Sequence, residues 1–311
     1  MLKSGSVKDM IHRNKQSVSS TTLIEKVVPI LLFAAAFISV LTTIGIVFTL
    51  IFETVLFFRE VPVREFFTGT VLRPLSPVEP QYSILPLIMG TMLTTIIAMF
   101  VAIPIGLTTA VYLSEYASKS ARKILKPMIE VLAGIPTIVY GFFAFTFVTP
   151  VLREIIPGLS ATNALSPGIV MGIMIIPLVA SLSEDAMNSV PNSMREGAMA
   201  LGATQLEVTF RVVIPAAISG IIASFVLGIS RAIGETMIVT IASGSSKNFT
   251  FDVTQSMQTM TAYIVEVTSG DAAAGTTIYY SLYAVAMTLF LFTLTMNLLA
   301  RYISKRFREV Y

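Results

Sequence analysis

The segment VPNSMREGAMALGATQLEVTFRVVIP, residues 190 to 215, lies between two strongly apolar runs and carries helix signals of its own. Ser193 and Glu196 form an S-x-x-E capping box, a pattern that starts a helix by satisfying its first backbone amides. Gly202 follows the helix-forming run and is placed to end that helix in the left-handed conformation. One short helix is therefore predicted before Gly202.

The second half of the same segment predicts another helix. Thr204 and Glu207 form a T-x-x-E box, and an apolar run leads from there to Pro215. The whole segment is therefore expected to form a compact helix–turn–helix unit. Two short interfacial helices that merely link membrane spans would have the same shape, so shape by itself assigns no function.

The composition of the chain is typical of an integral membrane protein. Of its 311 residues, 54% are hydrophobic and only 13% charged, and the mean hydropathy is +0.80, whereas soluble domains carry roughly 25% charged residues. Cysteine is absent and the single histidine, His12, lies in a polar N-terminal stretch. These counts exclude disulfides, thiolate metal sites and histidine catalysis within a membrane. The net charge of +3 gives no indication of nucleic-acid binding.

Six runs are long and apolar enough to cross a bilayer core, which needs about 20 residues per helix. They are residues 27–51, 84–113, 127–152, 161–183, 212–246 and 272–300. An all-α integral membrane fold with six transmembrane helices is therefore predicted. Residues 1–26 form a separate N-terminal segment in this division, and residues 27–311 form one transmembrane domain that includes the loop at 184–215.

The distribution of basic residues predicts the orientation of the spans. With the N-terminus in the cytoplasm, the inside segments hold 15 lysines and arginines and the outside segments hold 5. Basic residues are retained on the cytoplasmic side of cell membranes. Both termini and the loop at 184–215 are therefore predicted to be cytoplasmic, in a multi-pass protein of the cell (cytoplasmic or inner) membrane.

The fifth predicted span contains SRAIGETM, residues 230 to 237, with an arginine and a glutamate one helical turn apart. Small residues at four-residue spacing precede and overlap it: Gly220, Ser224, Gly228 and Ala232. In a continuous helix, Arg231 and Glu235 fall within this stripe, along which another helix approaches closely. The two charges are therefore expected to face protein or a water-filled cavity and not lipid.

Arg231 is a candidate anion site on a translocation path, because a planar guanidinium with a permanent charge suits oxyanions such as phosphate. Glu235 is a candidate filter: phosphate near neutral pH still carries a P–OH donor that a carboxylate accepts, whereas sulfate carries none. Thr236 is assigned to the same path. The alternative is an ion pair within the helix that only neutralises itself, although arginine before glutamate is the weaker order for such a pair.

The spacing within the first segment resembles the EAA loop of ABC importer permeases. That pattern is E-A-A, three residues, a glycine, nine residues and an apolar stretch that ends in proline. Here Glu196, Gly197 and Ala198 precede Gly202, and VVIP ends at Pro215. Gly197 stands where the pattern has its first alanine. The resemblance implies a coupling loop that docks in a groove on a separate ATPase subunit.

Three further stretches together resemble the phosphate-specific transport permeases. They are RAIGET at 231–236, AGIPTIVYG at 133–141 and ILPLIMGTMLTTIIAMFVAIPIGLTTAVYLSEYA at 84–117. The resemblance implies a type I ABC importer permease fold and import of inorganic phosphate. The long loop before the second span favours the C-type (PstC-type) permease over its A-type sister. A permease for another oxyanion, such as sulfate or molybdate, shares the coupling loop and is the alternative substrate class.

The partners and cofactors follow from the same resemblance. It implies a second homologous permease, a dimer of ATP-binding subunits and an extracytoplasmic phosphate-binding protein, with membrane lipid around the spans. No G-x-x-x-x-G-K-[ST] phosphate loop occurs in the chain. ATP and magnesium are therefore expected on the partner ATPase, and this chain is expected to be a transport subunit that performs no catalysis and holds no cofactor or metal.

Other classes of protein fit the sequence less well. An intramembrane hydrolase needs a polar catalytic group within the spans, but Asp9, Asp185, Asp252 and Asp271 all lie outside the predicted spans. A passive channel or a sensory scaffold leaves the spacing of the EAA-like loop unexplained.

Overall fold

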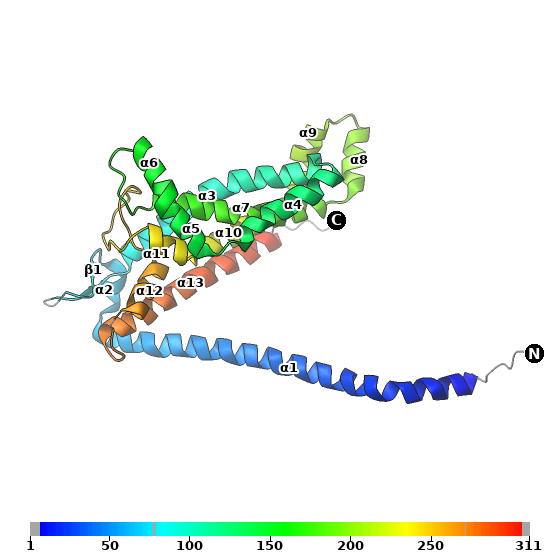
Figure 1. Cartoon of the computed structure of the whole chain (residues 1–311), viewed down its shortest axis with the longest axis horizontal. Coiled ribbons are helices and arrows are strands. Elements are labelled where there is room, and N and C mark those ends of the chain that lie inside the picture. Colours follow the sequence, from blue (N-terminus) through cyan, green and yellow to red (C-terminus); the bar gives the residue numbers. More distant parts are fainter. Residues whose placement is uncertain (1–6, 77–78, 271, 307–311) are drawn as a thin grey trace, which may run out of the picture. The chain divides into compact units, whose positions relative to one another are not determined.

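The computed structural model describes residues 7–76, 79–270 and 272–306 (Figure 1). The chain divides into two compact units, Met1–Phe52 and Glu53–Tyr311. The long helix α1 (Val7–Glu60) makes up the described part of the first unit, and its last residues belong to the second. α1 passes residue 26 without interruption, and the predicted division into a segment 1–26 and a domain 27–311 stays a prediction.

Six segments of the described chain are long and apolar enough to cross a membrane, as predicted. They are Val27–Glu60, Leu85–Tyr116, Thr137–Ile155, Leu165–Asn188, Gln205–Ile233 and Thr277–Tyr302. Each overlaps one of the six predicted runs. The predicted all-α fold with six spans is confirmed.

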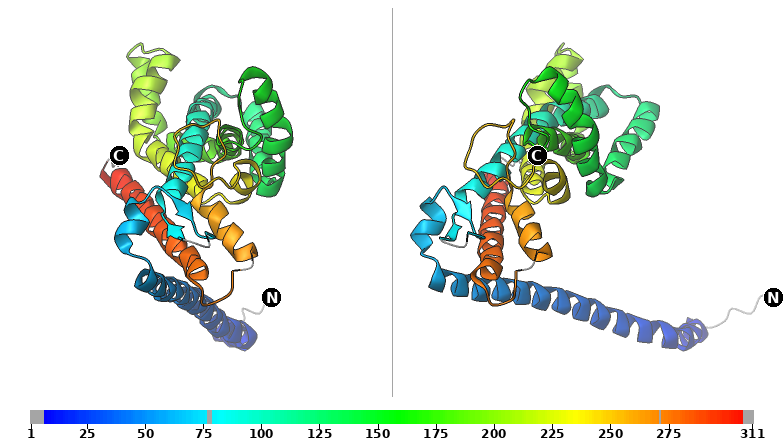
Figure 2. Two further views of the ribbon diagram at one scale, coloured as in Figure 1. Left: turned by 90° about the vertical axis from the view of Figure 1, so that its left-hand side faces the viewer. Right: turned by 60° about the vertical axis from the view of Figure 1, so that its left-hand side comes forward.

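In its described residues, the second unit contains short helices, one small hairpin and five of the six membrane-length segments. In chain order the elements after α1 are α2 (Val63–Thr68), β1 (Leu72–Arg73), β2 (Gln81–Tyr82), α3 (Leu85–Val111), η1 (Tyr112–Tyr116), α4 (Lys119–Gly134), α5 (Thr137–Phe143), η2 (Ala144–Val148), α6 (Thr149–Ile155), α7 (Leu165–Asn188), α8 (Asn192–Ala200), α9 (Gln205–Val208), η3 (Thr209–Val213), α10 (Ile214–Ile233), α11 (Met237–Ala242), α12 (Met260–Ser269) and α13 (Thr277–Arg306), where η marks a π-helical turn. α3, α7, α10 and α13 run side by side (Figures 1 and 2).

Small residues allow these helices to approach at backbone distance. A Cβ atom added to Gly172 of α7 would lie 2.7 Å from the carbonyl oxygen of Ala98 in α3. On α10 the predicted stripe of small residues faces α7: Ser224 Oγ lies 2.8 Å from Ser183 Oγ, and a Cβ on Gly220 would meet Ala186. The predicted close approach along this stripe is confirmed, and it fixes the spacing of the central helices.

The third predicted span, 127–152, begins too early. Residue 127 lies inside α4, which ends at Gly134, and the membrane-length segment starts only at Thr137. Pro136 separates the two because it lacks an N–H and disfavours helical geometry in Ile135. α4 buries none of its side chains in this chain and carries charges that keep it out of a span.

The fifth predicted span, 212–246, is not one helix. The helical segment begins earlier, at Gln205, and α10 ends at Ile233, while α11 starts at Met237. Hydropathy did not reveal this interruption, because the residues on both sides of it are equally apolar.

Three segments, 52–83, 153–166 and 247–271, are predicted to lie outside, and described residues of the first and the last meet at one end of the helix bundle. β1 and β2 form an antiparallel hairpin, and Val71 pairs with Asn248 from the other loop. Phe57, Phe66 and Tyr82 pack edge to face beneath the hairpin. α12 was not predicted, because residues 247–271 show no helical period. We call this end of the bundle the hairpin end.

Candidate functional site

The residues predicted for the substrate path lie at a break between two membrane helices. α10 ends at Ile233, and Gly234, Glu235 and Thr236 precede α11. Arg231 belongs to the last turn of α10. Backbone groups freed by such a break are tolerated at membrane depth only inside protein or beside a water-filled cavity. Discontinuous helices of this kind form the substrate sites of many transporters.

The prediction that Arg231 and Glu235 share one helical stripe is wrong, because the helix ends between them. Glu235 is only 8% exposed, whereas Arg231 is exposed on the surface of this chain. Within the described residues no ion pair joins the two side chains. The predicted arrangement, with both charges on one face, is replaced by a buried carboxylate and an outward arginine.

The Glu235 carboxylate caps the first turn of α11. Its Oε1 accepts hydrogen bonds from the backbone amides of Met237 at 3.2 Å and Ile238 at 3.5 Å. The backbone carbonyl of Glu235 accepts a bond from Thr261 Oγ1 at 2.7 Å, which ties the break to α12. A carboxylate at this position satisfies amides that the break would leave without partners. One oxygen of Glu235 is thus committed to the fold.

Arg231 has no hydrogen-bond or ion-pair partner in the part of the chain that the structure describes. Thr236 is half-buried in the break, and its hydroxyl bonds to the carbonyl oxygen of Gly234 at 3.3 Å. An arginine within a membrane span is costly unless a counter-charge, carbonyl groups or water receives it. Within the described residues no carboxylate or carbonyl group receives Arg231.

A second helix break lies against the first. It separates α4 from α5 at Ile135 and Pro136, inside the AGIPTIVYG stretch. A Cβ on Gly141 of α5 would lie 3.0 Å from the carbonyl oxygen of Met237, so α5 and α11 pack in backbone contact. Tyr140 bridges its own break by donating a hydrogen bond to the carbonyl of Leu132 at 2.8 Å. The fold thus brings the AGIPTIVYG and RAIGET stretches together.

The other predicted site is a helix–turn–helix unit, α8 and α9 with their connecting turn, which we call the loop unit. Gly202 ends α8 with φ at +91°, and its amide bonds to the carbonyl of Met199 at 2.9 Å. Thr204 Oγ1 accepts the Glu207 amide at 3.3 Å, while Glu207 Oε2 accepts the Thr204 amide at 3.0 Å. The predicted unit, its glycine stop and its second capping box are all confirmed.

The first predicted capping box is wrong. α8 begins at Asn192 after Pro191, and Ser193 lies inside the first turn with no capping hydrogen bond. Proline fixes its own φ and continues the extended chain up to residue 191. The helix therefore starts two residues earlier than a cap at Ser193 requires.

The predicted coupling residues lie mostly on the outer surface of the loop unit. Glu196, Gly197 and Gly202 are exposed, Ala198 is half-buried, and Pro215 is exposed at the start of α10. Large apolar side chains are also exposed on the loop unit and on the turn that follows it: Met199, Leu201, Leu206 and Phe210. Leu201 is the extreme case at 91% exposed. Exposed apolar side chains of this kind are typical of surfaces that another protein or the membrane covers.

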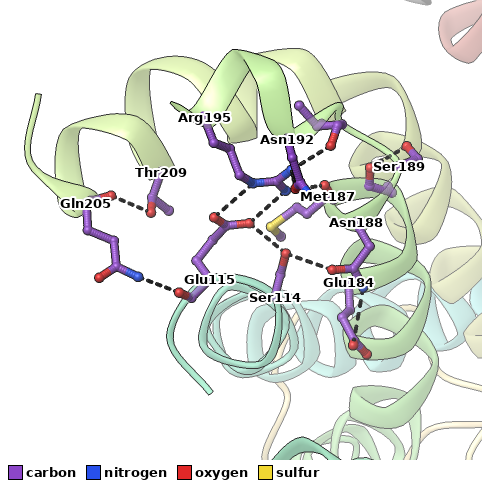
Figure 3. A network of polar contacts seen from close by, with 12 residues as sticks. Ser114, Glu115, Glu184, Met187, Asn188, Ser189, Asn192, Arg195, Gln205 and Thr209 are labelled. Carbon is purple, nitrogen blue, oxygen red and sulfur yellow. Dashed lines mark hydrogen bonds and ion pairs between the residues drawn. The ribbon is translucent and has the colours of Figure 1, made fainter. Parts of the chain in front are cut away.

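The inner surface of the loop unit carries an ion pair that sequence reasoning missed (Figure 3). Arg195 of α8 approaches Glu115 of η1 at two points, Nε to Oε2 at 3.3 Å and Nη2 to Oε1 at 3.0 Å. The side chains are only 14% and 7% exposed. Arg195 directly precedes the EAA-like residues, and Glu115 lies in the SEYA end of the 84–117 stretch.

A second group of charges holds α4 against α7. The Glu184 carboxylate of α7 is fully buried and pairs with Arg122 and with Lys126 Nζ, the latter at 3.1 Å. Asp185 lies 3.1 Å from the same lysine. Partial burial acts to lower the pKa of Lys126, but the hydrogen bonds and charges of Glu184 and Asp185 outweigh it and hold that pKa above the usual lysine value. Charge repeats in KSARKILKP could have suggested such a helix.

Within the described residues, no three side chains of histidine, cysteine, aspartate or glutamate come together as metal ligands would. The candidate site consists of the two helix breaks with Arg231, which has no partner within the described residues, and of the loop unit at the end of the bundle.

This arrangement of membrane helices with a protruding helix–turn–helix unit defines a class, the multi-pass membrane permeases. Residues 102–309 match the family described as binding-protein-dependent transport system inner membrane component. The chain belongs to this family.

Two curated relatives illustrate the degree of similarity. The chain is 34% identical over 242 residues to the probable ABC transporter permease protein YqgH of Bacillus subtilis, covering 78% of each protein. It is 33% identical over 251 residues to the phosphate transport system permease protein PstC of Mesorhizobium japonicum, covering 74% of this chain and 76% of that one. These relatives are permease subunits.

Solved structures confirm the predicted ABC importer permease fold. A bacterial ABC transporter involved in the import of the acidic polysaccharide alginate matches with a TM-score of 0.65 at 15% identity, covering 96% of this chain and all of that one, 100%. The MetNI methionine ABC transporter, in an inward facing conformation, matches with a TM-score of 0.55 at 15% identity, covering 71% of this chain and 94% of that one.

Proposed function

We propose that this chain is the membrane permease subunit of an ABC importer that moves inorganic phosphate into the cell, and that it is of the PstC type. The observation that carries the proposal is Arg231, an exposed arginine beside a broken membrane helix that has no partner among the described residues, in a chain whose relatives include described phosphate permeases. A guanidinium presents a planar fork of donors that suits two oxygens of a phosphate.

The substrate path in this proposal is formed by Arg231, Glu235 and Thr236. Arg231 is exposed on this chain, so a second homologous permease is needed to enclose it in a cavity. The two helix breaks supply backbone groups that are free to line that cavity. No bond is made or broken by this chain; the path binds the anion and releases it as the spans open to alternate sides.

Glu235 is proposed to favour phosphate over sulfate. Its Oε1 is engaged by the amides of α11, and its Oε2 accepts no hydrogen bond within the described residues. That oxygen is available to accept the P–OH proton of phosphate. Glu235→Gln keeps an acceptor oxygen for the cap but removes the charge, and we expect it to admit more sulfate. Sulfate exclusion that survives this change refutes the filter.

The loop unit is proposed to be the coupling loop, docked in a groove of one ATP-binding subunit of a dimer. The exposed apolar side chains around Leu201 and the exposed Glu196 supply a mixed surface of the kind that another protein covers. Leu201→Glu is expected to abolish co-purification of the ATPase from membranes. ATP and magnesium are assigned to that partner, so this subunit is not an enzyme by itself.

The orientation follows from the basic residues of the sequence. Both termini and the loop unit are proposed to be cytoplasmic, in the inner or cytoplasmic membrane. The hairpin end then faces outward, where an extracytoplasmic phosphate-binding protein would dock. Spin labels or impermeant thiol reagents directed to cysteines placed in the loop unit and in the hairpin test this orientation, because the native chain contains no cysteine.

The first experiment measures labelled phosphate uptake and ATP hydrolysis together in vesicles that hold the complete transporter. With Arg231→Gln we expect uptake to fall at least about tenfold, the loss of one charge-assisted contact, while ATP hydrolysis stimulated by the binding protein persists. Lys123→Gln is the matched control, because Lys123 of α4 is exposed and forms no ion pair within the described residues. Unchanged uptake with Arg231→Gln refutes the path, and loss of both activities assigns Arg231 to gating.

Two alternatives remain within the same fold. An A-type sister permease would take the other position in the heterodimer, and a permease for sulfate or molybdate would show uptake of those anions in the same vesicles. Competition of each anion against labelled phosphate tests the second alternative, because only a phosphate permease keeps phosphate uptake in a large excess of sulfate.

A further inference from the structure

The inner surface of the loop unit is fastened to the end of α3. We propose that the Arg195–Glu115 pair is the link through which movement of the loop unit reaches α3 and, beyond it, the substrate path. Arg195 and Glu115 are thus positioning residues of transport. The inference rests on the proposed function, because it assigns a role to the contact between the coupling loop and the spans.

Glu115 is held from both helices of the loop unit. Its carboxylate receives the two-point contact from Arg195 of α8, and its backbone carbonyl accepts a hydrogen bond from Gln205 Nε2 of α9 at 2.5 Å. The residues are separated by 80 and 90 positions in sequence. Because both α8 and α9 bind Glu115, the loop unit resists sliding and rotation relative to the end of α3. The loop unit and the end of α3 therefore form one rigid body.

Arg195 also closes the end of α7. Its Nη1 donates to the carbonyl of Val190 at 2.5 Å and its Nη2 to the carbonyl of Met187 at 2.7 Å. These are carbonyls near the end of α7, a region where helix carbonyls lack partners within the helix. A guanidinium with its donors in a fixed fork is suited to such simultaneous contacts, and a lysine is not.

The π-helical turn η1 places Glu115 where both helices reach it. The amide of Ala117 bonds to the carbonyl of Tyr112 at 2.8 Å, five residues back, so the last turn of α3 holds one more residue than an α-helical turn. Such π turns rotate the following side chains relative to the helix and occur often at functional sites. Ser114 in the same turn lies 2.7 Å from Glu115 Oε1 and supports its orientation.

Close packing extends from the end of α3 toward the substrate path. Gly172 brings α7 against the backbone of α3 at Ala98, and α3 reaches α10 where a Cβ on Gly228 would lie 3.2 Å from Met99 Cε. Gly228 precedes Arg231 by less than one helical turn. Helices packed this tightly move together because neither has free space into which it can yield.

Two neighbouring residues of α8 have different surroundings. Glu196 is exposed toward the proposed ATPase, and Arg195 points inward to Glu115 (Figure 3). In this proposal Glu196 receives the movement from the ATPase, and Arg195, the residue before it, transmits that movement to Glu115. The sequence motif of the coupling loop contains the receiving residue but not the transmitting one.

A cross-linking rescue tests the link. In complexes whose other subunits are free of cysteine, Glu115→Cys and Arg195→Cys are combined in one chain. With the thiols reduced, we expect phosphate uptake per ATP hydrolysed to fall by about fivefold or more, the lower range of measured coupling between sites, while stimulated hydrolysis persists. A short bifunctional thiosulfonate that joins the two thiols is expected to restore uptake.

Either of two results overturns the inference: an unchanged ratio of uptake to hydrolysis in the reduced variant, or no recovery after cross-linking. Wild-type vesicles provide the internal reference. If they take up no phosphate, the proposed function fails, and the link is then decided by a measurement that needs no substrate.

That measurement is the distance between spin labels on Ser193→Cys of α8 and Tyr116→Cys of η1. We expect one narrow distribution with and without ATP, because the two elements form one body, and a broadened distribution when Arg195→Gln is added. Glu196→Gln, an exposed neighbour of Arg195, is the matched control and is expected to leave the distribution narrow. A distribution that stays narrow with Arg195→Gln overturns the inference.

Discussion

The charges near the loop unit, at what we call the loop end of the bundle, differ from Arg231 at the helix break in whether the chain supplies their partners. At the loop end, Glu115 pairs with Arg195, and the fully buried Glu184 pairs with Arg122 and Lys126. At the breaks, Arg231 has no partner within the described residues. The paired charges stabilise the fold. In the proposed function, Arg231 is available to bind the anion or to contact the second permease.

We expect the largest loss of stability when Glu184 loses its partners. Arg122→Ala combined with Lys126→Ala leaves a fully buried carboxylate without a counter-charge. Removal of the partners of a buried charge costs about 3–5 kcal/mol, because the remaining ion keeps its desolvation penalty. We expect a loss of that size in the free energy of unfolding, measured by denaturation of the purified chain in detergent, and detachment of α4 seen as new protease cleavage between α4 and α5.

Lys123→Ala on the same helix is the control, because Lys123 is exposed and should change stability by less than about 0.5 kcal/mol. The raised pKa of Lys126 adds a pH test: its contribution is present below the ordinary lysine value of 10.5 and is lost as pH rises through the raised value. A double variant as stable as the control would contradict the assignment of these charges to structure.

At the helix breaks, packing and not charge is expected to determine stability. Gly141→Ala places a Cβ 2.9 Å from Ile241 Cδ1 and 3.0 Å from the carbonyl oxygen of Met237. The backbone of α11 yields little, so the cost should be about 1–3 kcal/mol. Gly134→Ala, in the same AGIPTIVYG stretch, meets nothing within 4 Å and should stabilise its helix by up to about 1 kcal/mol. Equal effects of the two changes in thermal unfolding would remove the proposed contact between the breaks.

The sequence predicts the features that depend on residues close together in the chain, and it does not predict those that depend on distant residues. The six spans, the turn at Gly202 and the box at Thr204 and Glu207 follow from hydropathy and local hydrogen bonding, and all are confirmed. The break after Ile233 has no such signal, since apolar residues lie on both sides of it. The pairing of Arg195 with Glu115 joins residues 80 positions apart and required the fold.

The candidate site shows the same limit. Sequence reasoning selected Arg231 and Glu235 because charges within an apolar run are rare, and this part needs no structure. It assumed a continuous helix and so placed both on one face, which is wrong because α10 ends between them. The roles of Arg231, Glu235 and Thr236 in the substrate path stay predictions.

The loop unit offers a smaller test, since two capping boxes were predicted and only one forms. Thr204→Ala removes a real cap and should cost about 1 kcal/mol. Ser193→Ala removes a hydroxyl that caps nothing, inside a helix that favours alanine, and should change stability by less than about 0.5 kcal/mol. Thermal unfolding and hydrogen exchange of the loop unit compare the two. A larger loss for Ser193→Ala would mean that the first box does form in solution.

The smallest effect on stability is expected at Arg231, where the effect on transport is expected to be large. Arg231→Gln removes a side chain that is exposed on this chain and has no partner in its described part, so the free energy of unfolding should change by less than about 0.5 kcal/mol. Arg231→Lys keeps the charge but loses the planar fork and should be equally stable, with uptake between that of wild type and Arg231→Gln.

Thermal unfolding of the purified chain is measured beside uptake by the complete transporter. A stability loss comparable with that of Arg122→Ala and Lys126→Ala would show that Arg231 has an internal partner after all, and the difference between the loop end and the helix breaks would disappear. Unchanged stability with lost uptake is the combination that a purely structural arginine does not produce, because a side chain that holds nothing in the isolated chain has only the ligand or the neighbouring permease left to act on.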